Sequence, residues 1–463
     1  KTMGEIEHII ENFAEENHGL LKKLDKDRYI AVIEDRYMRQ VEASRFPILD
    51  QIRGITAGDR ISATMSIGAG SKEGSLHESE ALARQALDMA LGRGGDQAAV
   101  KLRDGYEFFG GVSKGVEKRN KVRTRIVANA ITEIVQTSKN ILVMGHRFAD
   151  LDCVGAAVGL CAGLRNMGRT ARIVLDQERS LAQSLVNRVK ESGLGELFIA
   201  PDAALETLSD DTLLFVVDTH VKTLLESPTV YAGCRNVVVI DHHRKMVDHI
   251  EDAIIFFHEP YASSACEMVA ELNQYLGEKQ KISTAEAEAM LSGIMLDTKN
   301  FTLRTGVRTF EAAAYLRRMG ADTVEVRKLF ASTMEAYRNK AQLVASAQEY
   351  RGCAIAYTQR EQQDMRIIAS QAADELLNIE GVEASFLLFS SGSGVNMSAR
   401  SMGAVNVQVI MESLGGGGHL TMAAAQLKEI TMDEALAKLR GAIDSYLEMN
   451  SLPAGSSSPG VNQ

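Results

Sequence analysis

The chain has no tryptophan and only six prolines in 463 residues, and aromatic residues make up only 5% of it. Because proline interrupts helices and interior strands, its scarcity favours compact α/β structure rich in helices. No apolar stretch approaches the roughly 20 residues that a membrane-spanning helix needs. No signal peptide is visible, and the chain starts with Lys1 rather than Met, so we expect upstream residues to be missing.

Cysteine is also scarce, and no two cysteines form a Cys-x-x-Cys pair. We interpret all five as reduced, structural thiols of a cytosolic protein: Cys153, Cys161, Cys234, Cys266 and Cys353. The net charge of −10 disfavours a broad contact with long nucleic acid. It leaves room for a small anionic ligand in a local basic or metal-lined pocket.

The length is enough for about three domains, and the apolar pattern divides the chain into three α/β parts and a tail. Residues 1–103 read as a small α/β domain, with helical periods at 6–24 and 75–92 and a strand at 28–33. Residues 104–323 begin with a charged join and a long helix. Runs of Val, Ile and Leu then alternate with helical patterns, which indicates a parallel sheet covered on both faces. We expect its strands at 141–145, 171–175, 213–217 and 237–240.

Residues 324–450 form the third part, which starts with a helical linker. We expect strands at 353–358, 384–389 and 395–401, and helices at 405–414 and 432–448. The tail at 451–463 is rich in Pro, Gly and Ser and is predicted to be flexible.

Acids and histidines follow three of the predicted strands. The first strand ends at His146, with Asp150 and Asp152 just behind it; the others lead into Asp218-Thr219-His220 and Asp241-His242-His243. Open α/β sheets bind ligands at the carboxyl ends of their strands, so these clusters are expected to converge on one crevice. A single Asp after a strand is usually a cap or turn residue. Three such clusters in succession favour a functional site.

We predict six metal ligands, four carboxylates and two imidazoles: His146, Asp150, Asp152, Asp218, His242 and Asp297. This number exceeds the needs of one catalytic ion and suits two ions about 3.5–4 Å apart, bridged by a carboxylate and a water-derived hydroxide. Asp218 is the candidate bridging ligand. Mixed oxygen and nitrogen ligands favour Mn²⁺, with Mg²⁺ or Co²⁺ as alternatives. We interpret His220 as a neighbour of the site, and His249 and His258 as surface or turn histidines.

These motifs, in this order, resemble the DHH phosphoesterase superfamily, which includes exonucleases, oligoribonucleases, cyclic-dinucleotide phosphodiesterases and manganese pyrophosphatases. The resemblance implies that Asp241 orients a histidine ligand. It also implies that His243 lies near the scissile phosphate as a donor or orienting group.

A run of four glycines, Gly415–Gly418, precedes His419 and is a second candidate site. Its amides would form a nest for an anion, with a helix expected to start at Leu420. Alternatively, the run is a flexible loop with a chance histidine. Upstream, Arg400 is suited to bidentate phosphate contact. The pair resembles the DHH-associated substrate-binding domain, which implies six substrate-binding residues: Ser398, Arg400, Gly416, Gly417, Gly418 and His419.

Residues 26–32, Lys-Asp-Arg-Tyr-Ile-Ala-Val, resemble a diguanylate-cyclase GGDEF hairpin whose signature has degenerated. Without the two glycines, a phosphate cannot approach the backbone of the hairpin closely, and without the acid pair the hairpin cannot bind a metal ion. Cyclase activity is therefore not expected. The remaining hypothesis is a regulatory or dimerising domain.

A degenerate GGDEF domain, a parallel-sheet DHH domain and a smaller α/β DHH-associated domain resemble the bacterial cyclic-di-AMP phosphodiesterases. The resemblance implies hydrolysis of cyclic-di-AMP to linear pApA at two Mn²⁺ ions. It also implies a homodimer at the cytoplasmic face of the membrane, tethered by a segment absent from this chain. Two alternatives stay open: a hydrolase of short linear oligonucleotides or cyclic-di-GMP, and a nucleotide-sensing receptor without turnover.

Overall fold

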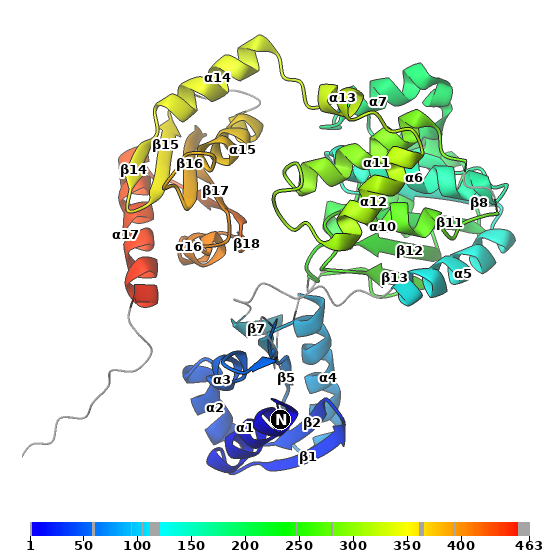
Figure 1. The fold of residues 1–463 in the computed structure, drawn as a ribbon. Helices are drawn as coiled ribbons and strands as arrows, with labels where there is room; N and C mark the ends of the chain where they lie inside the picture. Colours follow the sequence, from blue (N-terminus) through cyan, green and yellow to red (C-terminus); the bar gives the residue numbers. More distant parts are fainter. Residues whose placement is uncertain are drawn as a thin grey trace, which may run out of the picture. The chain divides into compact units, whose positions relative to one another are not determined.

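The computed structural model describes residues 2–57, 61–93, 95–103, 105–110, 121–246, 248–278, 281–360, 365–392 and 394–451. The chain divides into two compact units between Phe330 and Ala331 (Figure 1). The predicted tail beyond Ser451 and most of the charged join at 114–123 lie outside the described residues. Among the described helices, none combines the length and apolar character that crossing a membrane requires.

The first part of unit 1 opens with a helix and a β-hairpin. The helical period expected over 6–24 is wrong in its second half, because α1 ends at Glu16 and β1 begins at Leu20. The turn at His18, with φ of 51°, and Gly19 stops the helix. Strand β7 pairs with β6 as far as Gly110, so this sheet continues beyond residue 103. The elements are α1 Thr2–Glu16, β1 Leu20–Asp25, β2 Arg28–Val32, α2 Asp35–Ala43, α3 Ile48–Arg53, β3 Thr56–Ala57, β4 Ile61–Ser62, β5 Ile67–Ala69, α4 Leu76–Gly92, β6 Gln97–Leu102 and β7 Gly105–Gly110.

The rest of unit 1 is built on a six-stranded sheet of order β10-β9-β8-β11-β12-β13, in which every pair is parallel. The parallel sheet is therefore confirmed, and the two outer strands β10 and β13 were missed. The strands are β8 Asn140–Met144, β9 Arg172–Val174, β10 Phe198–Ile199, β11 Thr212–Val217, β12 Asn236–Asp241 and β13 Ile255–His258.

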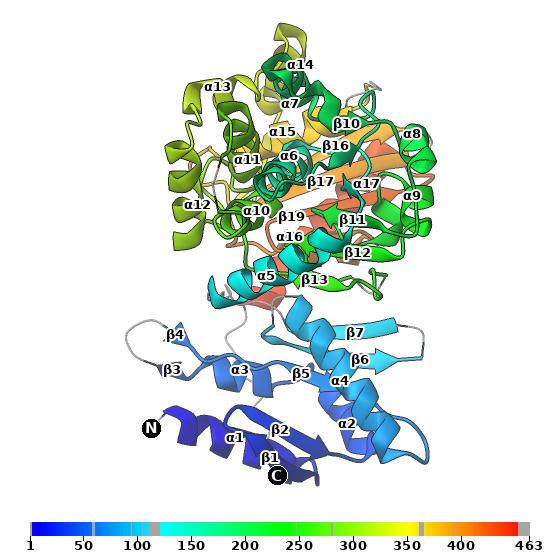
Figure 2. The same cartoon turned by 90° about the vertical axis from the view of Figure 1, so that its right-hand side faces the viewer.

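Helices cover both faces of this sheet (Figure 2). Alternate side chains of β8 enter the two cores, with Ile141 and Val143 on one face and Leu142 and Met144 on the other. The larger core includes α5, α6, α7 and α10–α13, and the smaller one includes α8 and α9. Their bounds are α5 Lys121–Thr137, α6 Leu151–Asn166, α7 Gln183–Val189, α8 Pro201–Glu206, α9 Pro228–Ala232, α10 Ala265–Asn273, α11 Thr284–Asp297, α12 Val307–Arg318 and α13 Thr323–Lys328.

Unit 2 contains a second six-stranded sheet, of order β14-β15-β16-β17-β19-β18. Only β15 and β16 are parallel, and the other pairs are antiparallel. Helices α14 and α15 lie on one face of the sheet, and α16 and α17 lie on the other. The elements are α14 Met334–Ala345, β14 Gln348–Tyr350, β15 Cys353–Thr358, α15 Met365–Leu376, β16 Ala384–Ser391, β17 Gly394–Ser401, α16 Val407–Ser413, β18 Gly417–His419, β19 Met422–Leu427 and α17 Met432–Ser451.

Candidate metal centre

The order of the strands in the first sheet creates the site. Chain connections leave β8 toward β9 on one side and β11 toward β12 on the other, so β8 and β11 flank the topological switch point. His146 follows β8, Asp218 follows β11, and His242 and His243 follow β12. Ligands of open α/β sheets bind outside the carboxyl ends of strands at such a point. The expected convergence of the three clusters is thus present.

One group of side chains surrounds His146. Its Nδ1 lies 2.9 Å from the carbonyl oxygen of Arg147, which leaves Nε2 directed at carboxylates. Nε2 lies 3.4 Å from Asp218 Oδ2 and 3.9 Å from Asp150 Oδ1. A nitrogen and two carboxylates therefore meet on this side of the site.

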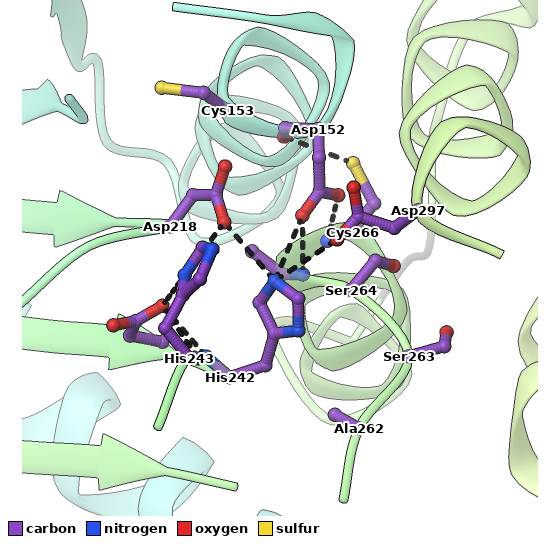
Figure 3. Close-up of polar contacts among 12 residues, drawn as sticks. Asp152, Cys153, Asp218, His242, His243, Ala262, Ser263, Ser264, Cys266 and Asp297 are labelled. Atoms are coloured by element: carbon purple, nitrogen blue, oxygen red, sulfur yellow. Dashed lines mark hydrogen bonds and ion pairs between the residues drawn. The ribbon is translucent and has the colours of Figure 1, made fainter. Parts of the chain in front are cut away.

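A second group surrounds His242, which is fully buried. Its Nε2 lies 3.3 Å from Asp218 Oδ1, 3.6 Å from Asp152 Oδ2 and 3.2 Å from Asp297 Oδ2. Figure 3 shows the ring of His242 directing this nitrogen toward the three carboxylates. Asp218 thus belongs to both groups, with one oxygen facing each histidine.

Helix N-termini hold the two acids of the first motif. Asp150 is the N-cap of α6 and accepts hydrogen bonds from the N–H groups of Asp152 and Cys153, each 3.0 Å long. Asp152 accepts from the first two N–H groups of α10, those of Ala265 at 2.7 Å and Cys266 at 2.9 Å. These bonds, and the positive end of each helix, fix the carboxylates without neutralising them.

Asp297 reaches the site because two helices approach closely. It ends α11, whose Gly293 lies against the start of α6. A Cβ on Gly293 would lie 2.7 Å from the Cα atom of Asp152, closer than such contacts allow. Glycine at this position therefore brings Asp297 and Asp152 together.

The site contains strong opposing electrostatic effects. Burial lowers the pKa of His146, but its contact with Asp218 and other nearby carboxylate charges raise it to about 10. Burial and the charge of Asp218 raise the pKa of Asp150 to about 6, and they raise that of Asp152 well above its usual range. Burial also opposes ionisation of Asp218, yet its contacts with His146 and His242 lower its pKa. Carboxylates clustered at a buried site repel one another, and a bound cation would relieve that repulsion.

Two buried atoms at the centre, Oδ1 of Asp218 and Nε2 of His242, have no hydrogen-bond partner. Buried polar atoms without partners are rare and require an explanation. Bound divalent cations would satisfy both atoms and neutralise the carboxylates. The donor set of oxygen and imidazole nitrogen therefore fits metal ions, as the sequence predicted. Cys153 lies beside this group, with its Sγ within 4.8 Å of ligand atoms of His146 and Asp218. Burial raises the pKa of its thiol well above its usual range.

Asp241 makes hydrogen bonds within its own motif, Asp241-His242-His243, and with His220. Its Oδ1 accepts hydrogen bonds from the N–H of His242 at 2.8 Å and from the N–H of His243 at 3.2 Å. The same oxygen lies 2.8 Å from Nδ1 of His243. Its Oδ2 makes a short hydrogen bond with Nδ1 of His220. Asp241 thus holds the backbone at His242 and His243 and the ring of His243.

Sequence reasoning missed several neighbours of the centre. Arg304 lies with a guanidinium nitrogen 3.4 Å from His242 Nδ1 and 3.3 Å from the carbonyl of Ala262. No motif marks it. The helix that starts after Ser264 was expected from the sequence, and its Ser-x-x-Glu pattern with Glu267 fits a helix N-terminus. The contact of its first two N–H groups with Asp152 was not expected. His258 is not a surface residue: it is buried, and its Nε2 donates to the carbonyl of His243.

In unit 2, Arg400 lies on β17 and is almost fully buried. Its Nη1 donates to the hydroxyl of Ser398 at 3.2 Å, and its Nε lies 3.3 Å from Asp374 Oδ1. Burial lowers the pKa of the guanidinium. In the sheet, Arg400 of β17 is paired with Met422 of β19, and Met422 is paired with His419 of β18. Arg400 and His419 therefore lie at the same level of the sheet, with one strand between them.

The helix expected at Leu420 is wrong. The glycines instead enter β18, which turns directly into β19. A Cβ on Gly416 would lie 2.2 Å from the carbonyl oxygen of Ala424, whereas one on Gly417 would meet nothing within 4 Å. Close strand packing therefore explains Gly416, and Gly417 has no such structural reason to be glycine. The side chain of His419 lies outside the described residues.

The degenerate signature forms a hairpin, as expected. Strands β1 and β2 pair antiparallel on either side of Lys26 and Asp27, and Asp25 pairs with Arg28. By the resemblance, Lys26 and Asp27 stand where a GGDEF hairpin has its two glycines, and Arg28 and Tyr29 stand where it has its acid pair.

Comparisons with known proteins agree with this site. Residues 140–294 match the DHH family, N-terminal domain, and residues 353–448 match the DHHA1 domain. Residues 1–108 match the GGDEF domain of GdpP-like cyclic-di-AMP phosphodiesterases. The chain therefore combines a DHH phosphoesterase domain, its associated domain and a divergent GGDEF domain.

The chain belongs to the family of GdpP-like cyclic-di-AMP phosphodiesterases. It is 42% identical to the cyclic-di-AMP phosphodiesterase GdpP of Bacillus subtilis over 452 residues, which cover 96% of this chain and 69% of the relative. It is 44% identical to GdpP of Geobacillus thermodenitrificans, covering 95% of this chain and 68% of the relative. It is 40% identical to the cyclic-di-AMP phosphodiesterase PdeA of Listeria monocytogenes, again covering 95% and 68%.

A solved structure supports the fold alone. The exopolyphosphatase-related protein from Bacteroides fragilis superposes with a TM-score of 0.58 at 20% sequence identity. The match covers 70% of this chain and 97% of that one.

Proposed function

We propose that this chain hydrolyses cyclic-di-AMP to linear pApA at a dinuclear Mn²⁺ centre. The observation that carries the proposal is the position of Asp218, whose Oδ2 faces His146 and whose Oδ1 faces His242. A carboxylate shared between two imidazoles suits a ligand that bridges two cations. The substrate is inferred from the relatives, which are named as cyclic-di-AMP phosphodiesterases.

The other ligands divide between the two ions. His146 and Asp150 would hold the first ion together with Asp218. Asp152, His242 and Asp297 would hold the second ion together with Asp218. The ligand atoms of these first three side chains lie within 4.8 Å of one another. When bound, the ions would supply Lewis acidity toward the phosphoryl oxygens and a water-derived nucleophile at neutral pH. Oxygen and imidazole ligands without thiolate favour Mn²⁺, with Mg²⁺ or Co²⁺ as alternatives.

The remaining residues bind and orient the substrate. Because the Nδ1–H of His243 donates to Asp241, its Nε2 would face the substrate. In its imidazolium form this ring, or else a water molecule, would give a proton to the leaving 3′ oxygen. In unit 2, Arg400 with Ser398 and the amides of Gly416–Gly418 would bind the second phosphate, and His419 would contact the phosphate or a base edge. We further propose, by family resemblance, a homodimer and a membrane tether in the full-length protein.

Substitution of the shared ligand tests the proposal. Asp218→Ala is expected to abolish Mn²⁺-dependent hydrolysis of cyclic-di-AMP, a loss of at least about 10³-fold, because both ions lose a ligand. Asp210→Ala is the matched control, since Asp210 is an exposed surface aspartate, whose ion pair with Arg235 is long. Circular dichroism and thermal unfolding establish that both variants fold. Full activity of folded Asp218→Ala would refute the shared-ligand assignment.

A further inference from the structure

His220 lies at the centre of a hydrogen-bond network behind the metal centre. It is fully buried and follows Asp218 by two residues. Its Nδ1 contacts Asp241, and its Nε2 lies 2.9 Å from the backbone nitrogen of Met246. Its carbonyl oxygen accepts a hydrogen bond of 2.9 Å from the N–H of Ile250. His220 therefore joins the end of β11 to Asp241 and to the loop that follows β12.

The partners of His220 determine where its ring proton lies. A backbone N–H can only donate, so Nε2 must present a lone pair to Met246. The single proton of the neutral ring then lies on Nδ1, from which it is donated to the carboxylate of Asp241. The ring is a fixed donor, and neither nitrogen is left to bind a metal.

The same carboxylate also holds the ring of His243 through its Nδ1. Its Oδ1 can only accept from His243 Nδ1, so that nitrogen carries a proton. With the bond from His220 on Oδ2, both oxygens of Asp241 are occupied, and the carboxylate cannot rotate without breaking contacts on each side. The orientation of His243 thus depends on a donor that comes from a different strand.

We propose that His220 is a positioning residue for phosphodiester hydrolysis. It fixes Asp241 and, through it, the Nδ1–H form of His243, so that Nε2 of His243 faces the substrate. This role rests on the proposed function. It differs from a packing role for a buried ring, although the ring does lie near those of Phe256 and His258, with centroids 6.1 Å and 5.5 Å away.

Three variants separate positioning from packing. His220→Phe keeps an aromatic ring but removes both nitrogens. His220→Asn keeps a donor near the position of Nδ1, although it cannot reach Met246. His249→Ala is the matched control, because the His249 ring lies 6.5 Å from that of His220 and its Nδ1 faces the carbonyl of Met246 rather than Asp241.

The kinetic result expected for cyclic-di-AMP is a change in kcat with little change in KM. His220→Phe should lower kcat about 10- to 100-fold while the content of bound Mn²⁺ stays as in the wild type, since outer partners of a metal site have effects of this size. His220→Asn should recover most of kcat, and His249→Ala should match the wild type. Wild-type kcat in His220→Phe, or equal losses in the Phe and Asn variants that follow their loss of thermal stability, would overturn the positioning role.

Nuclear magnetic resonance of ¹⁵N-histidine in the Mg²⁺-loaded wild type tests the same network without any substitution. His220 is expected as the neutral Nδ1–H tautomer. A ring protonated on Nε2 would overturn the proposal, even if every variant failed to fold. If the wild type does not cleave cyclic-di-AMP, the proposed function fails, while the tautomer measurement still decides the state of His220.

Discussion

Asp218 follows β11 with a backbone φ of 59°, a conformation that few residues other than glycine adopt. Aspartate tolerates this left-handed region better than most residues. This turn places the carboxylate of Asp218 between His146 and His242. The same residue therefore sets both the backbone turn after β11 and the central negative charge of the site. Such strained positions cluster at functional sites.

Asp297 belongs to the His242 group alone, so its loss should remove one ion rather than both. We expect Asp297→Ala to bind about one Mn²⁺ per chain where the wild type binds about two. Equilibrium dialysis with elemental analysis measures this ratio, and Asp252→Ala, an exposed aspartate outside the site, is the control. Retention of two ions by the variant would contradict the assignment of Asp297.

His146 links metal binding to pH. Its pKa is raised to about 10, so without a cation its ring is protonated at neutral pH. A ligand imidazole must be neutral, so binding releases this proton and is favoured as pH rises toward that pKa. We expect Mn²⁺ affinity to increase by up to about tenfold per pH unit for this one proton. Calorimetric titrations near pH 7 and pH 8, in buffers of different ionisation enthalpy, measure the release. Affinity independent of pH, with no proton released, would refute this linkage.

At the level of the elements, two neighbouring glycines at the start of β18 allow strand packing and the proposed phosphate binding to be tested separately. Gly416→Ala is expected to destabilise the protein by about 1–3 kcal/mol, because its Cβ would meet the backbone of β19. Gly417→Ala meets no atom within 4 Å and should fold normally. Hydrolysis is expected to be impaired, because the added Cβ would hinder the close approach of a phosphate to the amide proposed to bind it. Thermal unfolding and activity assays compare the two. Normal activity of Gly417→Ala would remove this loop from the site.

The strands that carry the metal motifs were predictable because they are buried on both faces. Continuous Val, Ile and Leu residues mark β8, β11 and β12, and their polar ends locate the site. The edge strand β10 covers only Phe198–Ile199, which is too short for its pattern to mark a strand. Leu20, Leu21 and Leu24 continue the spacing of the preceding helix, so periodicity alone placed β1 in a helix.

The contacts that fix the ligands were beyond the sequence pattern. Asp152 is held by the N-terminus of α10, more than a hundred residues away in the chain. Asp297 depends on the close packing permitted by Gly293. Both contacts join segments that are far apart in the chain. The sequence therefore predicted which residue types would be ligands and where their strands end, but not the contacts that hold these side chains in place.

At the scale of the whole chain, three parts with separate chemistry follow one another. The divergent GGDEF hairpin lacks the residues of a cyclase, the DHH domain carries the candidate metal centre, and unit 2 carries Arg400 and the glycine-rich strand. This combination distinguishes the family from DHH proteins that share the metal motif alone.

Product analysis with a panel of dinucleotides in Mn²⁺ tests the central claim most directly. Cyclic-di-AMP, cyclic-di-GMP, linear pApA and short linear oligonucleotides are each incubated with the wild-type chain, and the products are separated by chromatography. We predict that cyclic-di-AMP is cleaved fastest, that linear pApA accumulates and that chelation of the metal stops the reaction. Binding of cyclic-di-AMP without any product, or cleavage of linear oligonucleotides only, would contradict the account.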